Sequence, residues 1–100
     1  MKISNPRDAE DALRSLVDVE KELPASDAGN VRELLDAGEV SLAFDTLCTQ
    51  LYEFDIRISP VSKATLDAVG RRLGLDPELW TVLEVSGPGA PGPAEREPGN

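Results

Sequence analysis

Cys48 is the only thiol in this 100-residue chain. The chain has no histidine that could act as a general base and turn this thiol, or a serine or threonine hydroxyl, into a nucleophile. Ser–His–Asp and Cys–His catalysis both require that general base. Most zinc sites require several histidine or cysteine ligands at short spacing, and a calcium loop requires a D-x-D-x-D-G pattern that does not occur. We therefore predict a protein that is not an enzyme and that uses no metal and no cofactor.

Carboxylate pairs such as Asp45 with Glu53 are the remaining residues with catalytic potential, because such pairs can hydrolyse glycosides. In so acidic a chain, however, pairs of this kind are expected on any solvated helix face, and nothing apolar around them would raise a pKa. The glycines of residues 87–92 lack the lysine and the following helix signal that a phosphate-binding loop requires. We expect no small-molecule substrate.

The charge of the chain is strongly negative, with 19 acidic against 10 basic residues and a formal net charge of −9. Residues 27–55 contribute −6 of this total. Such a field repels nucleic acid and anionic membranes and favours a basic partner, although acidity can also serve solubility alone. We expect neither nucleic-acid nor membrane binding.

Compartment is predicted from what the chain lacks. One cysteine cannot form an internal disulfide, and the first residues, MKISNPRDAED, contain no apolar core of a signal peptide. No apolar run approaches the ~18 residues of a membrane span. A cytoplasmic protein is the expectation.

Proline, glycine and capping residues predict an all-α fold, a bundle of four to five short helices in residues 1–85, followed by a disordered Pro/Gly-rich tail in residues 86–100. The first helix is expected to start at Asn5-Pro6 and end at Pro24, and the second to be capped by Ser26 or Asp27 and end at Gly38. After a helix within residues 38–59, a further helix is expected to start at Ser59-Pro60 and end at Gly74, and a last one to start at Asp76-Pro77.

The stretch 38–59 holds both phenylalanines, the only tyrosine and the only cysteine. Helical periodicity of about 100° per residue predicts a buried face formed by Ala43, Phe44, Leu47, Cys48, Leu51 and Phe54. Residues 55–58 are predicted to form an extended connector without a strand partner, whose isoleucines enter the core. The helix after Ser59-Pro60 is predicted to place Val61 toward the core. The last helix is predicted to bury Leu79, Trp80 and Leu83, and the pattern also allows Val82.

The opposite side of the same stretch is the candidate binding surface, because an exposed tyrosine and leucine lie among carboxylates. A solvated polar face that tolerates one leucine is an equally good interpretation of this pattern. The predicted partner-binding residues are Asp36, Glu39, Leu42, Asp45, Thr49, Tyr52, Glu53 and Asp55.

The run GEVSLAFDTLCTQLYEFDIRIS, followed by a helix ending in GLD and then by Pro77-Glu78-Leu79-Trp80, resembles the MafI-type immunity proteins of bacterial polymorphic toxin systems. The similar positions include Gly38, Glu39, Ala43, Leu47, Cys48, Leu51, Tyr52, Glu53, Asp55 and Trp80. This resemblance implies a cytoplasmic inhibitor that binds the C-terminal domain of a cognate toxin, often a nuclease. The alternative is an acidic regulatory module that docks on a basic housekeeping protein.

Overall fold

The computed structural model describes residues 6–86, and these residues form five helices, which confirms the predicted all-α class. Residues 1–5 and 87–100 lie outside the described part, and with them the predicted cap at Asn5 and nearly all of the predicted tail. The helices are α1 (Pro6–Val19), α2 (Ala25–Asp36), α3 (Val40–Glu53), α4 (Pro60–Leu73) and the single turn α5 (Glu78–Thr81).

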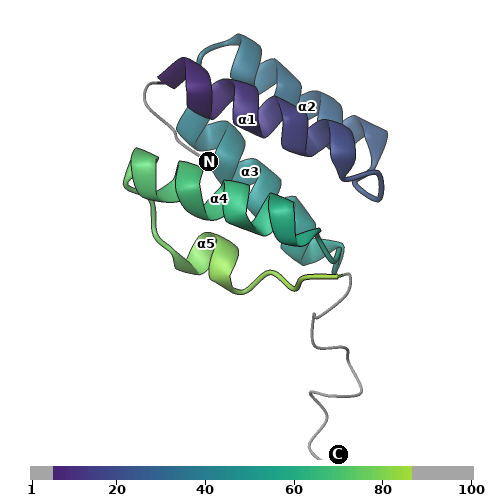
Figure 1. Cartoon of the computed structure of the whole chain (residues 1–100). Helices are drawn as coiled ribbons and strands as arrows, with labels where there is room; N and C mark the ends of the chain where they lie inside the picture. The colour runs from purple at the N-terminus through teal and green to yellow at the C-terminus, as the bar shows by residue number, and fades with distance from the viewer. Residues whose placement is uncertain (1–5, 87–100) are drawn as a thin grey trace, which may run out of the picture.

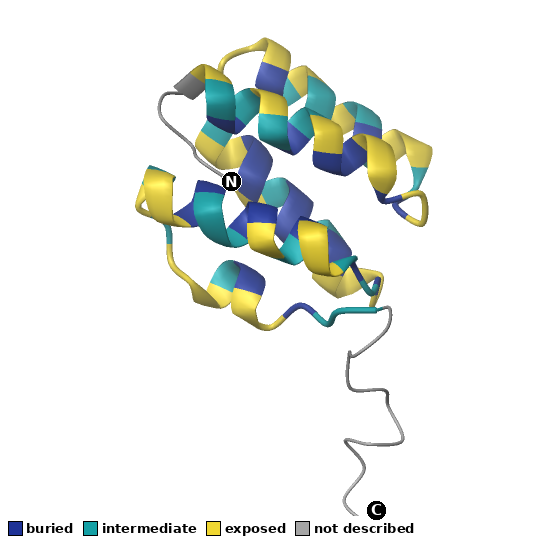
Figure 2. Ribbon diagram, viewed as in Figure 1, coloured by how far each residue is buried: buried dark blue, intermediate teal, exposed yellow. Residues whose placement is uncertain are grey.

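The helices α1 and α2 lie side by side at one end of the molecule, α5 lies at the other end, and α3 and α4 lie between them (Figure 1). Helix α1 packs against α4, and α2 packs against α3. Buried residues face the space between the helices (Figure 2), where they form one hydrophobic core. Its largest side chains are Trp80 and Phe44. Helices α3 and α5 are also in contact with each other, and each has exposed residues.

Local signals fix the ends of α4 and the end of α2 as predicted. The Ser59 hydroxyl accepts a hydrogen bond from the Ser62 backbone N–H at 3.0 Å, with Pro60 as the first helical residue. Gly38 and Gly74 have φ angles of 80° and 72°, the left-handed conformation that glycine adopts at least cost.

Two predicted boundaries were wrong. Helix α1 ends at Val19 rather than at Pro24, because the chain turns after Glu20 and brings Leu23 into the core. Helix α2 begins at Ala25 with Pro24 at the N-cap, so neither Ser26 nor Asp27 caps it. The extended backbone of Pro24, with ψ of 145°, already accepts the first helical hydrogen bond from Ala28 at 2.9 Å.

Glu20, the residue that follows α1, links α1 to the start of α4. Its carboxylate is buried and accepts hydrogen bonds from the Ser62 hydroxyl at 2.5 Å and the Ser59 backbone N–H at 3.2 Å. A carboxylate at the N-terminus of a helix is stabilised by the helix dipole and by otherwise unpaired N–H groups. The carboxylate of Glu20, just after the end of α1, therefore caps the N-terminus of α4.

Three residues predicted to be buried are exposed: Phe54 by 49%, Val61 by 73% and Val82 by 51%. Phe54 ends α3, and the chain then turns back so that Ile56 takes the core position. The buried side of α4 is centred on Ser62, Leu66 and Val69, which leaves Val61 outside it. After α5, Leu83 enters the core as predicted, whereas Val82 does not.

The connector 55–58 has a pairing partner, contrary to prediction. The Ile58 N–H donates to the Glu84 carbonyl at 2.9 Å, and the Ser86 N–H donates to the Ile58 carbonyl at 2.8 Å. This isolated parallel bridge joins Ile58 to Val85. Ile56 and Ile58 are both buried, as predicted. The bridge holds the chain after α5 against the connector between α3 and α4, just before α4 begins.

Candidate functional site

Helix α3 separates its apolar and polar sides as its periodicity predicts. Ala43, Phe44, Leu47, Cys48 and Leu51 are buried. On the opposite side Leu42 is 50% exposed and Tyr52 is 62% exposed, next to exposed Asp45, Thr49 and Glu53. The helix contains no lysine or arginine. We call Leu42, Asp45, Thr49, Tyr52 and Glu53 the outer face of α3.

All eight predicted binding residues are exposed, but they do not form one continuous surface. Five make up the outer face of α3, where the Thr49 hydroxyl donates to Asp45 at 3.3 Å. Glu39 and Asp55 flank the two ends of the helix. Asp36 is directed elsewhere, because its carboxylate forms an ion pair at 2.6 Å with Arg14 of α1. Its charge is therefore partly neutralised, and it is separate from the outer face.

Asp55 has a left-handed backbone, with a φ of 54°, and is the only residue other than glycine in the described chain with positive φ. Its N–H donates to the Tyr52 carbonyl at 3.1 Å, and the Ile56 N–H donates to the Leu51 carbonyl at 3.0 Å. These two bonds form the same helix-ending motif that glycine completes in α2 and α4. An L-residue adopts this conformation at a cost of about 1–2 kcal/mol, which is reduced for Asp and Asn. The chain thus keeps a carboxylate where glycine would be more stable.

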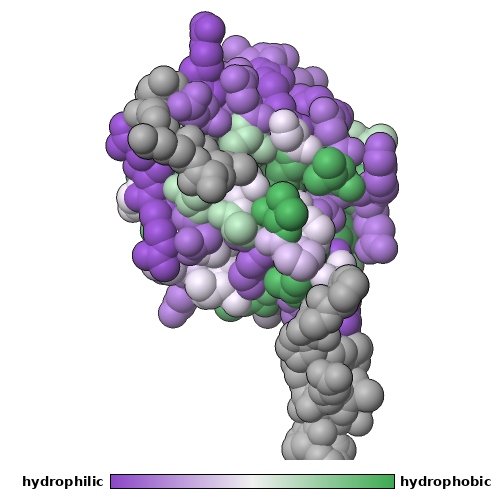
Figure 3. Space-filling view, viewed as in Figure 1, coloured by the Kyte–Doolittle hydropathy of each residue, from purple (hydrophilic) through white to green (hydrophobic). Residues whose placement is uncertain are grey.

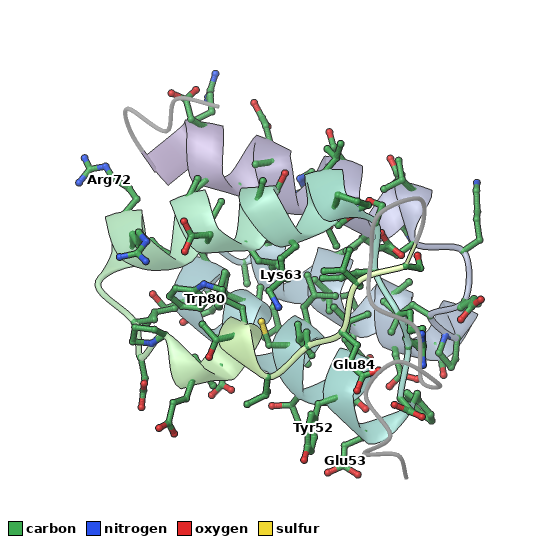
Figure 4. The ribbon with its side chains drawn as sticks, turned by 60° about the horizontal axis from the view of Figure 1, so that its bottom comes forward. Tyr52, Glu53, Lys63, Arg72, Trp80 and Glu84 are labelled. Carbon is green, nitrogen blue, oxygen red and sulfur yellow. The ribbon has the colours of Figure 1, made fainter. Side chains whose placement is uncertain are left out.

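A groove between α3 and α5, which we call the α3–α5 groove, was not predicted from the sequence. It has a volume of about 160 Å³ and is lined by Cys48, Thr49, Tyr52, Glu78, Leu79 and Val82. A smaller hollow of about 50 Å³ adjoins it and is lined by Leu51, Tyr52, Asp55, Ile56, Val82, Leu83 and Glu84. Tyr52 and Val82 line both. In Figure 4, Tyr52 and Glu53 point away from the body of the protein, and Glu84 lies on the segment that follows α5.

The contributions of Glu78, Leu79, Val82 and Glu84 were missed because they lie about 30 residues after α3 in the sequence. The start signal at Asp76-Pro77 predicts α5, and the Asp76 carboxylate does accept a hydrogen bond from the Glu78 N–H at 3.0 Å. That local signal does not indicate which helices α5 contacts. The tertiary structure shows that these are α3 and α4.

Trp80 sets the position of α5 and is buried, as predicted. Its ring meets that of Phe44 edge to face with centroids 5.5 Å apart. The indole N–H donates to Asp67 at 3.1 Å, and this bond, together with one from Arg71, holds the pKa of Asp67 below its usual value. Because Phe44 belongs to α3 and Asp67 to α4, one side chain of α5 is fixed to both helices that border it.

Basic groups near α5 are engaged with other partners. Lys63 donates to the Leu83 carbonyl at 2.5 Å and to the Thr81 carbonyl at 3.4 Å, at the C-terminal end of α5, where a cation is favourable. Partial burial lowers the pKa of Lys63. Arg57 forms an ion pair with Glu84 at 3.5 Å. Among the residues that line the groove and its adjoining hollow, the described structure places three carboxylates and no cation.

Apolar exposure alone does not single out the α3–α5 groove. Val19 is 59% exposed and Val61 73% exposed on other helices. The face seen in Figure 3 is hydrophilic along its margins and has hydrophobic residues toward its middle and right side. The groove differs from scattered apolar residues because it is hollowed, is lined by an exposed aromatic ring and by the Glu78 carboxylate, and adjoins a hollow that two further carboxylates line.

Cys48 lies at the bottom of the α3–α5 groove but is 1% exposed. Burial, and secondarily the nearby Asp45 carboxylate, raise the pKa of its thiol to about 12. We predict that this thiol reacts with Ellman's reagent near neutral pH only when the protein unfolds, because the reactive species is the thiolate. The same reaction in urea provides the control, since Cys48 is the only cysteine. Rapid reaction of the native protein would contradict the assigned burial.

Within residues 6–86 no cluster of His, Cys, Asp or Glu has the geometry to hold a metal ion. None of the helices in the same range is long and apolar enough to span a membrane. No protein-family model, curated protein or solved structure matches this chain.

Proposed function

We propose that this chain is an immunity protein that binds and neutralises a cognate toxin domain, which we expect to be a nuclease. It would do so by covering the basic active surface of the toxin with the outer face of α3. The observation that carries the proposal is the exposure of Leu42 and Tyr52 among carboxylates on a helix that has no basic residue. Large exposed side chains surrounded by charge are typical of protein-binding hot spots.

The charge of the chain supports the choice of a basic partner. A nuclease binds a polyanion, so its active surface is positively charged, and a protein of net charge −9 is attracted to it over long range. Such complementarity accelerates association and disfavours partners of the wrong charge. The inhibitor needs no reactive group, since occlusion requires only shape and charge. The resemblance to MafI-type immunity proteins points to the same class of partner.

The test is a double charge reversal, Asp45→Lys with Glu53→Lys, measured by calorimetry against the toxin domain encoded beside this chain and by rescue of growth. We expect binding to weaken by about a hundredfold or more, because loss of favourable contacts and new repulsion each cost on the order of 1–3 kcal/mol. The salt dependence of the remaining affinity should be smaller than that of the unchanged protein or reversed.

The matched control is Asp11→Lys with Glu22→Lys, which changes the net charge by the same amount at exposed positions in α1 and the turn after it. These changes should slow association slightly and leave growth rescue intact. Equal loss in both variants would mean that net charge, not the outer face of α3, determines binding. Unchanged affinity after reversal of Asp45 and Glu53 would contradict the proposed surface.

The regulatory alternative uses the same surface with a different basic protein. It is distinguished by the gene next to this one, since an immunity protein is expected beside a large gene with a variable C-terminal toxin domain. Failure of a pull-down with that domain, together with capture of a basic housekeeping protein that depends on Asp45 and Glu53, would favour the regulatory module.

A further inference from the structure

We propose that the α3–α5 groove receives one arginine side chain of the basic partner, which makes it the anchoring pocket of the interface. This inference rests on the proposed function and extends it from a charged helix face to a defined pocket. The groove includes residues of α5, Glu78, Leu79 and Val82, that the outer face of α3 does not contain.

The size of the groove fits one side chain. Its volume is about 160 Å³, and a cavity of about 150 Å³ is known to hold a benzene-sized molecule. It is therefore too small to receive a helix and large enough for a single long side chain. Leu79 and Val82 provide an apolar lining on one side, and Tyr52 provides an exposed ring on the other.

The chemistry of the lining favours arginine over an apolar side chain or lysine. The aliphatic stem of arginine can pack against Leu79 and Val82 while its charged end stays partly hydrated. Its planar guanidinium can stack on the Tyr52 ring, which lysine does less well. The Glu78 carboxylate lines the groove and the Asp55 carboxylate lines the adjoining hollow, so the guanidinium would have an acceptor on each side of that ring.

Charge argues against the two other occupants. A second copy of the chain carries the same net charge of −9 and would bring carboxylates against carboxylates. Residues 87–100 contain two glutamates and one arginine and are also net acidic. A basic partner is the occupant that the lining complements.

The experiment is an NMR titration of the full-length protein with the peptide acetyl-Gly-Arg-Gly-amide, which requires no toxin. The control peptide replaces arginine with citrulline, which has nearly the same shape and no charge. We expect saturable shifts of the Tyr52, Leu79 and Val82 signals with a Kd on the order of millimolar for arginine, and binding weaker by about tenfold for citrulline. Equal binding of both peptides, or no saturable shift, would overturn the proposal.

A matched pair of variants separates the groove from general acidity. Val82→Lys places a cation in the groove, whereas Val61→Lys makes the same change at an exposed valine of α4. Val82→Lys should raise the Kd of the arginine peptide by about tenfold, and Val61→Lys should raise it by less than about twofold. Equal effects would show nonspecific attraction and overturn the pocket. The proposal would also be overturned if, in the free protein, the groove were occupied by residues 87–100 or by a second copy of the chain.

The two proposals fail in different ways. If reversal of Asp45 and Glu53 abolishes growth rescue but Val82→Lys leaves it intact, the immunity function stands and the arginine pocket is wrong. If the arginine peptide binds in the groove but the neighbouring toxin domain does not bind the protein, the pocket stands and the immunity function is wrong.

Discussion

Gly70→Ala is expected to destabilise the protein, although alanine normally stabilises a helix relative to glycine by about 1 kcal/mol. Gly70 is buried within α4, and an added Cβ would overlap the Trp80 ring, closest to Cζ3 and Cη2 and still only 2.7 Å from Cε3. The ring cannot move aside easily because it is packed on Phe44 and bonded to Asp67. Overpacking of this kind costs about 1–3 kcal/mol, and the net result should be a lower melting temperature with displacement of α5.

The control is Gly29→Ala in α2, where an added Cβ meets nothing within 4 Å. This variant should be more stable by about 0.5–1 kcal/mol, because alanine reduces the freedom of the unfolded chain and favours the helix. Urea denaturation followed by the fluorescence of Trp80, the only tryptophan, measures both variants. If Gly70→Ala raised the stability as Gly29→Ala does, the indole could not lie against α4.

Displacement of α5 in Gly70→Ala would also open the α3–α5 groove, since α5 provides Glu78 and Leu79 to its lining. The variant should therefore lose binding of the arginine peptide even at temperatures where α1 to α4 remain folded. Helical circular dichroism that persists while Trp80 fluorescence changes would identify this state.

Leu47→Ala is expected to cost about 2–5 kcal/mol, because it removes a fully buried side chain from the centre of the core. Leu47 is 0% exposed and lies on the inner side of α3. In a domain of this size such a loss is a large part of the total stability. Thermal or urea unfolding measures the effect.

Leu42→Ala makes the same substitution on the same helix but at a side chain that is 50% exposed. Its effect on the free energy of unfolding should be within about 0.5 kcal/mol, while binding of the partner should weaken. The pair therefore tests both assignments of α3 at once. A protein that tolerated Leu47→Ala and unfolded with Leu42→Ala would have the opposite side of the helix in its core.

The sequence by itself determined those features that depend on neighbouring residues. Ser59 caps the helix that Pro60 begins, and Gly38 and Gly74 end theirs, because capping needs only the few residues at a helix terminus. The two sides of α3 follow from a period of about 100° per residue, so the positions of Leu47 and Leu42 were predictable.

Helical periodicity did not predict which side chains are buried at helix ends. Phe54 has the right spacing to join the buried side of α3, yet the helix stops there and Ile56 takes the core position. Whether a residue at a helix end is buried depends on which element packs beside it, and the spacing of apolar residues carries no information about that. The exposure of Val61 and Val82 has the same cause.

Tertiary structure alone decided what surrounds the outer face of α3. The bond from Trp80 to Asp67, the close approach to Gly70 and the pairing of Ile58 with the chain at Val85 join segments that are distant in sequence. Such contacts arise from packing, which no local pattern encodes. Residues 38–59 therefore predicted an acidic helix with one exposed tyrosine, and the docking of α5 beside it turned that helix into a surface with a groove.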